Sequence, residues 1–121
     1  MSRLRYPEES LRLAELSLAA NDVPAMVRFY DAVLGTALEP YAAYGTTFYR
    51  GSLHGTRFVI APNELAGVDA AQNRHQFVYV AEDLESLLAR ALAAGGTVRD
   101  STDGVATVLD PDGNTLVFQA G

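Results

Sequence analysis

The pattern of hydrophobic and polar residues predicts a short strand in two stretches of the chain, and each stretch leads into a segment of helical periodicity. Between Leu11 and Ala20 the alternation predicts a strand. From Val23 to Leu34 the apolar residues fall at the spacing of an amphipathic helix, with Asp22 suited to cap its start and Gly35 its end. The strand would present Leu16, Leu18 and Ala20 on one face, and Glu15, Ser17 and Ala19 on the other.

Three shorter strands are expected after this helix. Their β-branched and aromatic residues place them near residues 38–42, 45–50 and 55–61. The turns are expected at Gly45, Gly51 and Gly55. The next residues, 62–74, are small, polar and aperiodic, which indicates a linker.

The second half of the chain repeats this order of elements. A strand at 76–81 leads to Asp83 as a helix cap, and apolar residues then run at helical spacing from Leu84 to Leu92. Gly95 and Gly96 are expected to end the helix. Short strands follow near 97–100, 103–109 and 114–119, with Asp110–Asn114 as the turn between the last two.

The two halves are related by a nearly constant offset. Residues with matching roles lie 61 positions apart in the pairs Glu15 and Gln76, Asp22 and Asp83, and Gly35 and Gly96. Val59 and Val117 lie 58 positions apart, so the second copy is shorter before its last strand. We therefore predict an α+β fold in one domain, residues 1–121, with a first βαβββ module at 11–61, a linker at 62–74 and a second module at 75–121.

Composition and charge narrow the classes of function. The sequence is 49% hydrophobic and 20% charged, as is usual for soluble globular proteins, and it has no Cys, which excludes disulfides and thiolate chemistry. Its net charge of −6 and its lack of Lys argue against a nucleic-acid partner. No apolar run is long enough to cross a bilayer, and the first residues lack the apolar segment of a secretory signal. We expect a cytoplasmic protein with no membrane partner.

The chain resembles the vicinal oxygen chelate superfamily, which includes glyoxalase I, bleomycin-resistance proteins and extradiol dioxygenases. The resemblance covers residues 13–119 and rests on the segments ELSLAANDVPAMVRFYDAVLG, EDLESLLARALAAGG and DPDGNTLVF. It implies two tandem βαβββ modules that form a curled mixed sheet around a cleft, with the helices outside. It also implies a homodimer, because a second chain often completes the cleft in the resembling proteins.

The same resemblance implies which positions would hold a divalent metal ion. In metal-dependent members, the first and last strands of each module each supply one ligand, and the matching positions here are Glu15, Val59, Gln76 and Val117. A valine side chain has no lone pair for a cation. We therefore expect no metal and no other cofactor. The residues expected to line the cleft and bind a ligand are Glu15, Ser17, Tyr49, Arg57, Val59, Gln76 and Val117.

Glu15 is open to two interpretations. Its carboxylate could hold a cationic ligand or act as a base, or it could be neutralised by Arg57, which the resemblance places close to it. Several aromatic residues also lie in the predicted strands, and Tyr49 is the one that we expect in the cleft. The two histidines are expected to have no special role, because His54 lies in a turn and His75 faces away from the cleft unless the register slips by one residue.

Two functions follow from these expectations. The first is a metal-free binding protein of the bleomycin-resistance type that sequesters a planar or cationic organic molecule and bears on antibiotic resistance. The alternative is a divalent-metal-dependent lyase, isomerase or dioxygenase that uses Glu15, Gln76 and His75. A third possibility is a domain that serves only as an interaction surface.

Overall fold

The structure is a computed structural model of the chain and describes residues 12–66, 73 and 75–121. The first module contains β1 (Glu15–Ala20), α2 (Val23–Leu34), β2 (Glu39–Ala43), β3 (Thr46–Leu53) and β4 (Thr56–Pro62). The second contains β5 (Gln76–Ala81), α4 (Leu84–Ala93), β6 (Thr97–Thr102), β7 (Val105–Leu109) and β8 (Thr115–Ala120). The predicted fold class and the order of elements in both halves are confirmed.

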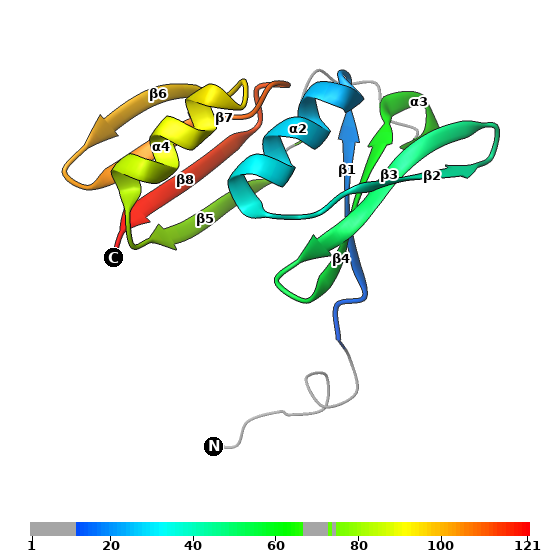
Figure 1. Ribbon diagram of the computed structural model, residues 1–121, viewed down its shortest axis with the longest axis horizontal. Helices are drawn as coiled ribbons and strands as arrows, with labels where there is room; N and C mark the ends of the chain where they lie inside the picture. The colour runs from blue at the N-terminus through cyan, green and yellow to red at the C-terminus, as the bar shows by residue number, and fades with distance from the viewer. Residues whose placement is uncertain (1–11, 67–72, 74) are drawn as a thin grey trace, which may run out of the picture.

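Each module forms its own four-stranded mixed sheet, and the two sheets have the same topology. Sheet A has the order β1-β4-β3-β2 and sheet B the order β5-β8-β7-β6. In both, the first strand pairs in parallel with the last, and the other neighbours are antiparallel. The sheets lie side by side with α2 and α4 on the same side of them (Figure 1). We call the face of each sheet that is turned away from the helices its inner face.

The helix ends follow the predicted capping residues. The Asp22 carboxylate accepts a hydrogen bond from the Ala25 N–H at 3.1 Å, and Asp83 accepts one from the Ser86 N–H at 3.1 Å. Gly35 ends α2 in the left-handed conformation, with φ 67°, which glycine adopts without a steric penalty. These local signals explain why the helices begin and end where the sequence predicts.

The two modules share one hydrophobic core between the helices and the sheets. Its largest fully buried side chains come from both modules: Leu18, Met26, Phe29, Tyr30, Phe58, Ile60, Val108, Leu116 and Phe118. The Tyr30 ring contacts the rings of Phe29 and Phe58, with centroids 5.1 and 5.4 Å apart. Burial of this apolar surface stabilises each module and also holds the two modules together.

The turn between β7 and β8 makes polar contacts across the module junction. The Tyr30 hydroxyl donates to the Asp110 carboxylate at 2.7 Å, and both residues are buried. The Asp112 carboxylate accepts from the backbone N–H groups of Asn21, at 2.7 Å, and Asp22, at 3.2 Å, at the start of α2. Burial, and then the Asp110 carboxylate, raise the pKa of Tyr30, so its hydroxyl stays protonated and can donate. The predicted turn therefore also connects the modules.

Two features of the chain differ from the prediction. Gly51 lies inside β3 and not at a turn, because the Thr36 carbonyl packs against its α-carbon and accepts a hydrogen bond from the Ser52 N–H at 2.8 Å. A side chain at Gly51 would occupy the place of that carbonyl. The predicted linker begins with a one-turn helix, α3 (Asn63–Ala66), and residues 67–72 and 74 lie outside the described part.

Within the described ranges, no helix is long and apolar enough to cross a membrane. A cytoplasmic location stays an expectation from the sequence.

Candidate functional site

The inner face of sheet A carries charged and aromatic side chains from all four strands. Residues that pair directly across neighbouring strands point to the same face of a sheet. The register pairs Ser17 of β1 with Val59 of β4, and Val59 with Arg50 of β3. Glu15 pairs with Arg57 in the same way. Leu18, Phe58 and Ile60, which alternate with these residues on the same strands, lie in the core on the helix side. Glu15, Ser17, Arg50, Arg57 and Val59 therefore face away from the helices.

Glu15, Ser17 and Arg57 form one polar cluster on this face. The Ser17 hydroxyl donates to the Glu15 carboxylate at 2.7 Å, and the Arg57 guanidinium lies 3.9 Å from that carboxylate. The side chains of Arg57 and Glu15 are 55% and 43% exposed, so solvent screens the ion pair and it contributes little to stability. The structure thus places Glu15 beside Arg57, the pairing that the sequence left open. Val59 lies next to this cluster and is only 5% exposed.

A second cluster on the same face combines a cation with aromatic rings. The Arg50 guanidinium carbon lies 3.7 Å from the centre of the Tyr41 ring, within the range of a cation–π contact. The Tyr41 and Phe48 rings meet edge to face, with centroids 4.9 Å apart. We call Tyr41, Phe48 and Arg50 the aromatic–arginine cluster. Arg50 was not among the residues expected in the cleft, although its position two residues from Phe48 on one strand was a signal that they share a face.

The expectation that Tyr49 lines the cleft is wrong. Tyr49 pairs with Ile60, which is fully buried on the helix side, and its ring packs against the hydrophobic core. Phe48 and Tyr49 are consecutive aromatic residues, so one of them must lie on each face of the strand. The alternation within this strand could not decide which, and the pairing with β4 places Phe48 on the inner face.

The inner face of sheet B is less polar than that of sheet A. Gln76 pairs with Thr115, and Val117 lies between Val78 and Thr107. Val78 and Val80 are 56% and 67% exposed, so this face presents apolar side chains to solvent. No hydrogen bond or ion pair joins Glu15 to Gln76 within the described ranges. Glu15 and Gln76, the two polar residues of the predicted wall, therefore lie on different sheets.

Each histidine contacts an aromatic side chain of β5. The His54 Nε2 atom lies 2.9 Å from the Tyr79 hydroxyl, and so joins the β3–β4 turn to β5. The His75 ring packs edge-on against Phe77, on the helix side of sheet B, with centroids 4.8 Å apart. Burial lowers the pKa of His75, and the nearby Asp110 carboxylate partly opposes that shift. His75 therefore cannot join Glu15 and Gln76 on the inner face, as the metal-dependent alternative requires.

The side chains at the four positions implied by the resemblance do not fit a divalent metal ion. Only Glu15 and Gln76 carry oxygen donors, and the Glu15 carboxylate is already engaged by Ser17 and Arg57. Val59 and Val117 occupy inner-face positions and offer no lone pair. These four positions therefore do not supply a ligand set for metal-dependent chemistry.

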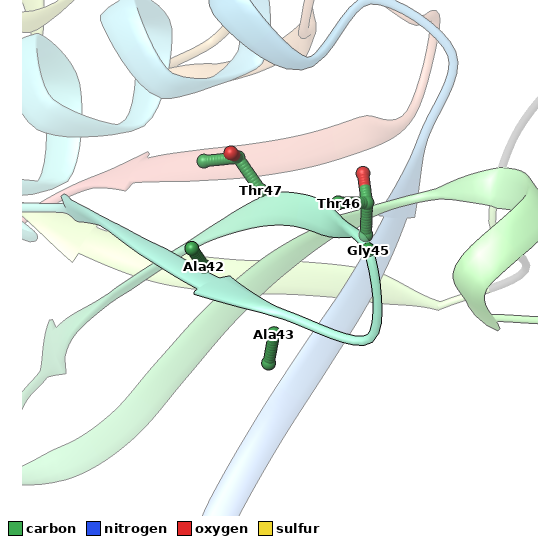
Figure 2. Close-up of a pocket in the computed structure, with 5 residues that line it drawn as sticks. All are labelled: Ala42, Ala43, Gly45, Thr46 and Thr47. Carbon is green, nitrogen blue, oxygen red and sulfur yellow. The ribbon is translucent and has the colours of Figure 1, made fainter.

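A shallow hollow of about 440 Å³ lies elsewhere, on the β2–β3 hairpin. Figure 2 shows its lining residues, Ala42, Ala43, Gly45, Thr46 and Thr47, along the two strands and the turn between them. These side chains are small and carry no charge or aromatic ring. The aromatic–arginine cluster offers more specific chemistry for recognising a ligand.

Comparison with known proteins gives the class of fold first. A glyoxalase-related enzyme from Fulvimarina pelagi is 21% identical, with a TM-score of 0.69 over 91% of this chain and 88% of that one. A glyoxalase/bleomycin resistance protein/dioxygenase family enzyme from Burkholderia phytofirmans PsJN is 17% identical, with a TM-score of 0.70 over 91% and 98% of the two chains. TnmS3, an antibiotic binding protein from Streptomyces sp. CB03234, is 19% identical, with a TM-score of 0.65 over 91% and 94%.

The family is shown by a match to the whole folded region. The family model of the glyoxalase-like domain matches residues 15–118, so the chain belongs to that family. No curated protein sequence matches this chain. The resemblance to the vicinal oxygen chelate superfamily that the sequence motifs indicated is thereby confirmed.

Proposed function

We propose that the protein binds a planar organic molecule on the inner face of sheet A without the help of a metal ion. The aromatic–arginine cluster is the observation that carries this proposal, because two aromatic rings and a guanidinium group lie together on one face, next to Val59. Planar ligands stack on aromatic rings and on guanidinium groups. The fold of TnmS3, an antibiotic binding protein, is shared by this chain, so binding of this kind is compatible with the architecture.

The contacts of Glu15 favour a planar ligand over a cationic one. A cationic ligand would need a carboxylate that is open to it, and the Glu15 carboxylate already accepts from Ser17 and faces Arg57. A cation there would have to share the carboxylate with these two side chains. We therefore propose a planar organic ligand rather than a cationic one.

A second copy of the chain is proposed to complete the binding site. The inner face of sheet B exposes Val78, Val80 and Val105 at 56%, 67% and 41%, and apolar side chains grouped on one face favour burial against a partner. A two-fold related copy would lay its sheet B over sheet A of the first chain and would enclose the ligand between them. Sedimentation equilibrium should give twice the chain mass of 13.0 kDa; a monomer at every concentration would contradict the dimer.

The binding proposal is tested by thermal unfolding with planar aromatic probes. A compound that binds the folded state at 100 times its Kd stabilises it by about 2.7 kcal/mol, so its binding raises the unfolding temperature. The Ser17→Trp variant should abolish this shift, because a large side chain on the inner face of β1 would fill the space for the ligand. The matched control is Ser101→Trp, at an exposed position on β6 of the other sheet, which should respond to the probes like the wild type.

Metal content separates this proposal from the enzyme alternative. After dialysis against Mg²⁺, Mn²⁺, Fe²⁺, Ni²⁺ and Zn²⁺ and then against buffer, elemental analysis should find much less than one ion per chain. A stoichiometric ion whose loss abolishes probe binding would overturn the proposal.

A further inference from the structure

We infer that Arg50 recognises an acidic group, such as a carboxylate, at the edge of the planar ligand. This inference rests on the proposed function and narrows its ligand class. The guanidinium carbon of Arg50 lies 3.7 Å from the centre of the Tyr41 ring. The Arg50 side chain makes no hydrogen bond or ion pair with the described residues. Arg50 is also partly buried.

A stacked guanidinium still has its hydrogen-bond donors free. The five N–H groups of arginine point outward in the plane of the group, so a ring that covers one flat face leaves them available. The contact with Tyr41 also restricts the movement of the guanidinium group. Two parallel N–H groups can then meet the two oxygens of a carboxylate, the arrangement in which arginine binds acids most strongly.

The neighbouring charges support an acidic ligand. Arg57 is the other cation on this face, and it is committed to Glu15. Glu39 pairs with Arg50 across β2 and β3, yet its carboxylate forms no ion pair with Arg50 within the described residues. Among the described residues, Arg57 therefore has a carboxylate partner and Arg50 has none. An acid attached to a ring could stack beside Tyr41 and Phe48 and neutralise Arg50 at the same time.

Three probes with the same ring system test the inference at neutral pH. They are 2-naphthoate, which is anionic, 2-naphthamide, which is neutral, and 2-naphthylmethylamine, which is cationic. Titrations followed by ¹⁵N-HSQC spectra should show that the wild type binds the acid about tenfold more tightly than the amide, as a charge-assisted hydrogen bond provides. The preference should weaken at high salt, because ions screen charge interactions at a partly exposed site.

Variants assign the preference to Arg50. Arg50→Gln should bind the acid and the amide equally, and Arg50→Lys should keep part of the preference, because it retains the charge without the planar group. Glu39→Gln should bind the acid two- to threefold more tightly, since it removes a nearby like charge. The matched control is Arg28→Gln, which removes an exposed arginine from α2 on the other side of the sheet; its preference should equal that of the wild type.

Each outcome decides the inference. A preference for the acid that disappears only in Arg50→Gln supports it. If the wild type binds the amide as tightly as the acid, or if Arg50→Gln keeps the preference while its unfolding temperature is unchanged, the inference is overturned and the proposed function stands. Tightest binding of the amine overturns it as well. If none of the three probes binds, both the inference and the proposed function are overturned.

Discussion

The hydrogen bond between Tyr30 and Asp110 should be a main contributor to the stability of the module junction. Tyr30→Phe keeps the ring, and with it the contacts to Phe29 and Phe58, and removes only the hydroxyl that donates to Asp110 at 2.7 Å. Tyr30 is fully buried and Asp110 is 3% exposed, so water cannot replace the lost donor. A hydrogen bond to a charged group in such a place contributes about 1.5–3 kcal/mol.

The size of the effect follows from what remains around Asp110. Its carboxylate still accepts from the Asn114 side chain at 2.8 Å and from the backbone N–H groups of Asp112 and Asn114 at 2.9 Å. These bonds keep the charge solvated by the protein, so the turn should stay folded in the variant. For a chain of this length, about 4 °C of unfolding temperature corresponds to 1 kcal/mol, and we therefore expect a decrease of about 6–12 °C.

Calorimetry of Tyr30→Phe and of a matched control measures this loss. Tyr44→Phe removes the same hydroxyl from a residue that is 86% exposed at the tip of the β2–β3 hairpin. That control should stay within about 0.5 kcal/mol of the wild type, as exposed substitutions usually do. If the two variants are equally stable, the junction does not depend on the Tyr30–Asp110 bond and the reasoning is refuted.

Two further predictions concern Gly51 and His75. Gly51→Ala should lower the free energy of unfolding by about 1–3 kcal/mol, because its new methyl group would overlap the Thr36 carbonyl. Urea unfolding measures this loss, and the control Ser52→Ala, at the exposed next position, should not show it. Equal stabilities of the two variants would contradict the close approach of the carbonyl to Gly51. Burial lowers the pKa of His75 below its ordinary 6.5, so the folded state keeps the imidazole neutral while the unfolded chain takes up a proton. This contribution to stability is complete above pH 6.5 and decreases as the pH falls below that value. The buried Nε2 atom of His75 has no hydrogen-bond partner in the described part. His75→Phe should therefore be at least as stable as the wild type at neutral pH and should lose less stability by about pH 5.5. Urea unfolding at the two pH values measures this, and equal losses in the variant and the wild type would exclude this role of His75.

The sequence alone determined the elements and their repetition. Strand and helix periodicities are set by residues two to four positions apart, and the caps at Asp22, Asp83 and Gly35 act on their own neighbours. These short-range signals do not depend on the rest of the chain, so they predicted both modules. The two-residue alternation also placed Glu15 and Ser17 on one face of the first strand, and the structure shows that this is the inner face.

Only the tertiary structure decided which residues meet. Phe48 and Tyr49 were equally suited to the inner face, and the hydrogen-bond register with β4 selected Phe48. Arg50 meets Tyr41 because β2 and β3 pair, and Tyr30 meets Asp110, 80 positions away in the chain, because the modules pack together. Such contacts depend on strand register and module packing, which are properties of the whole fold and leave no periodic trace in the sequence around each residue.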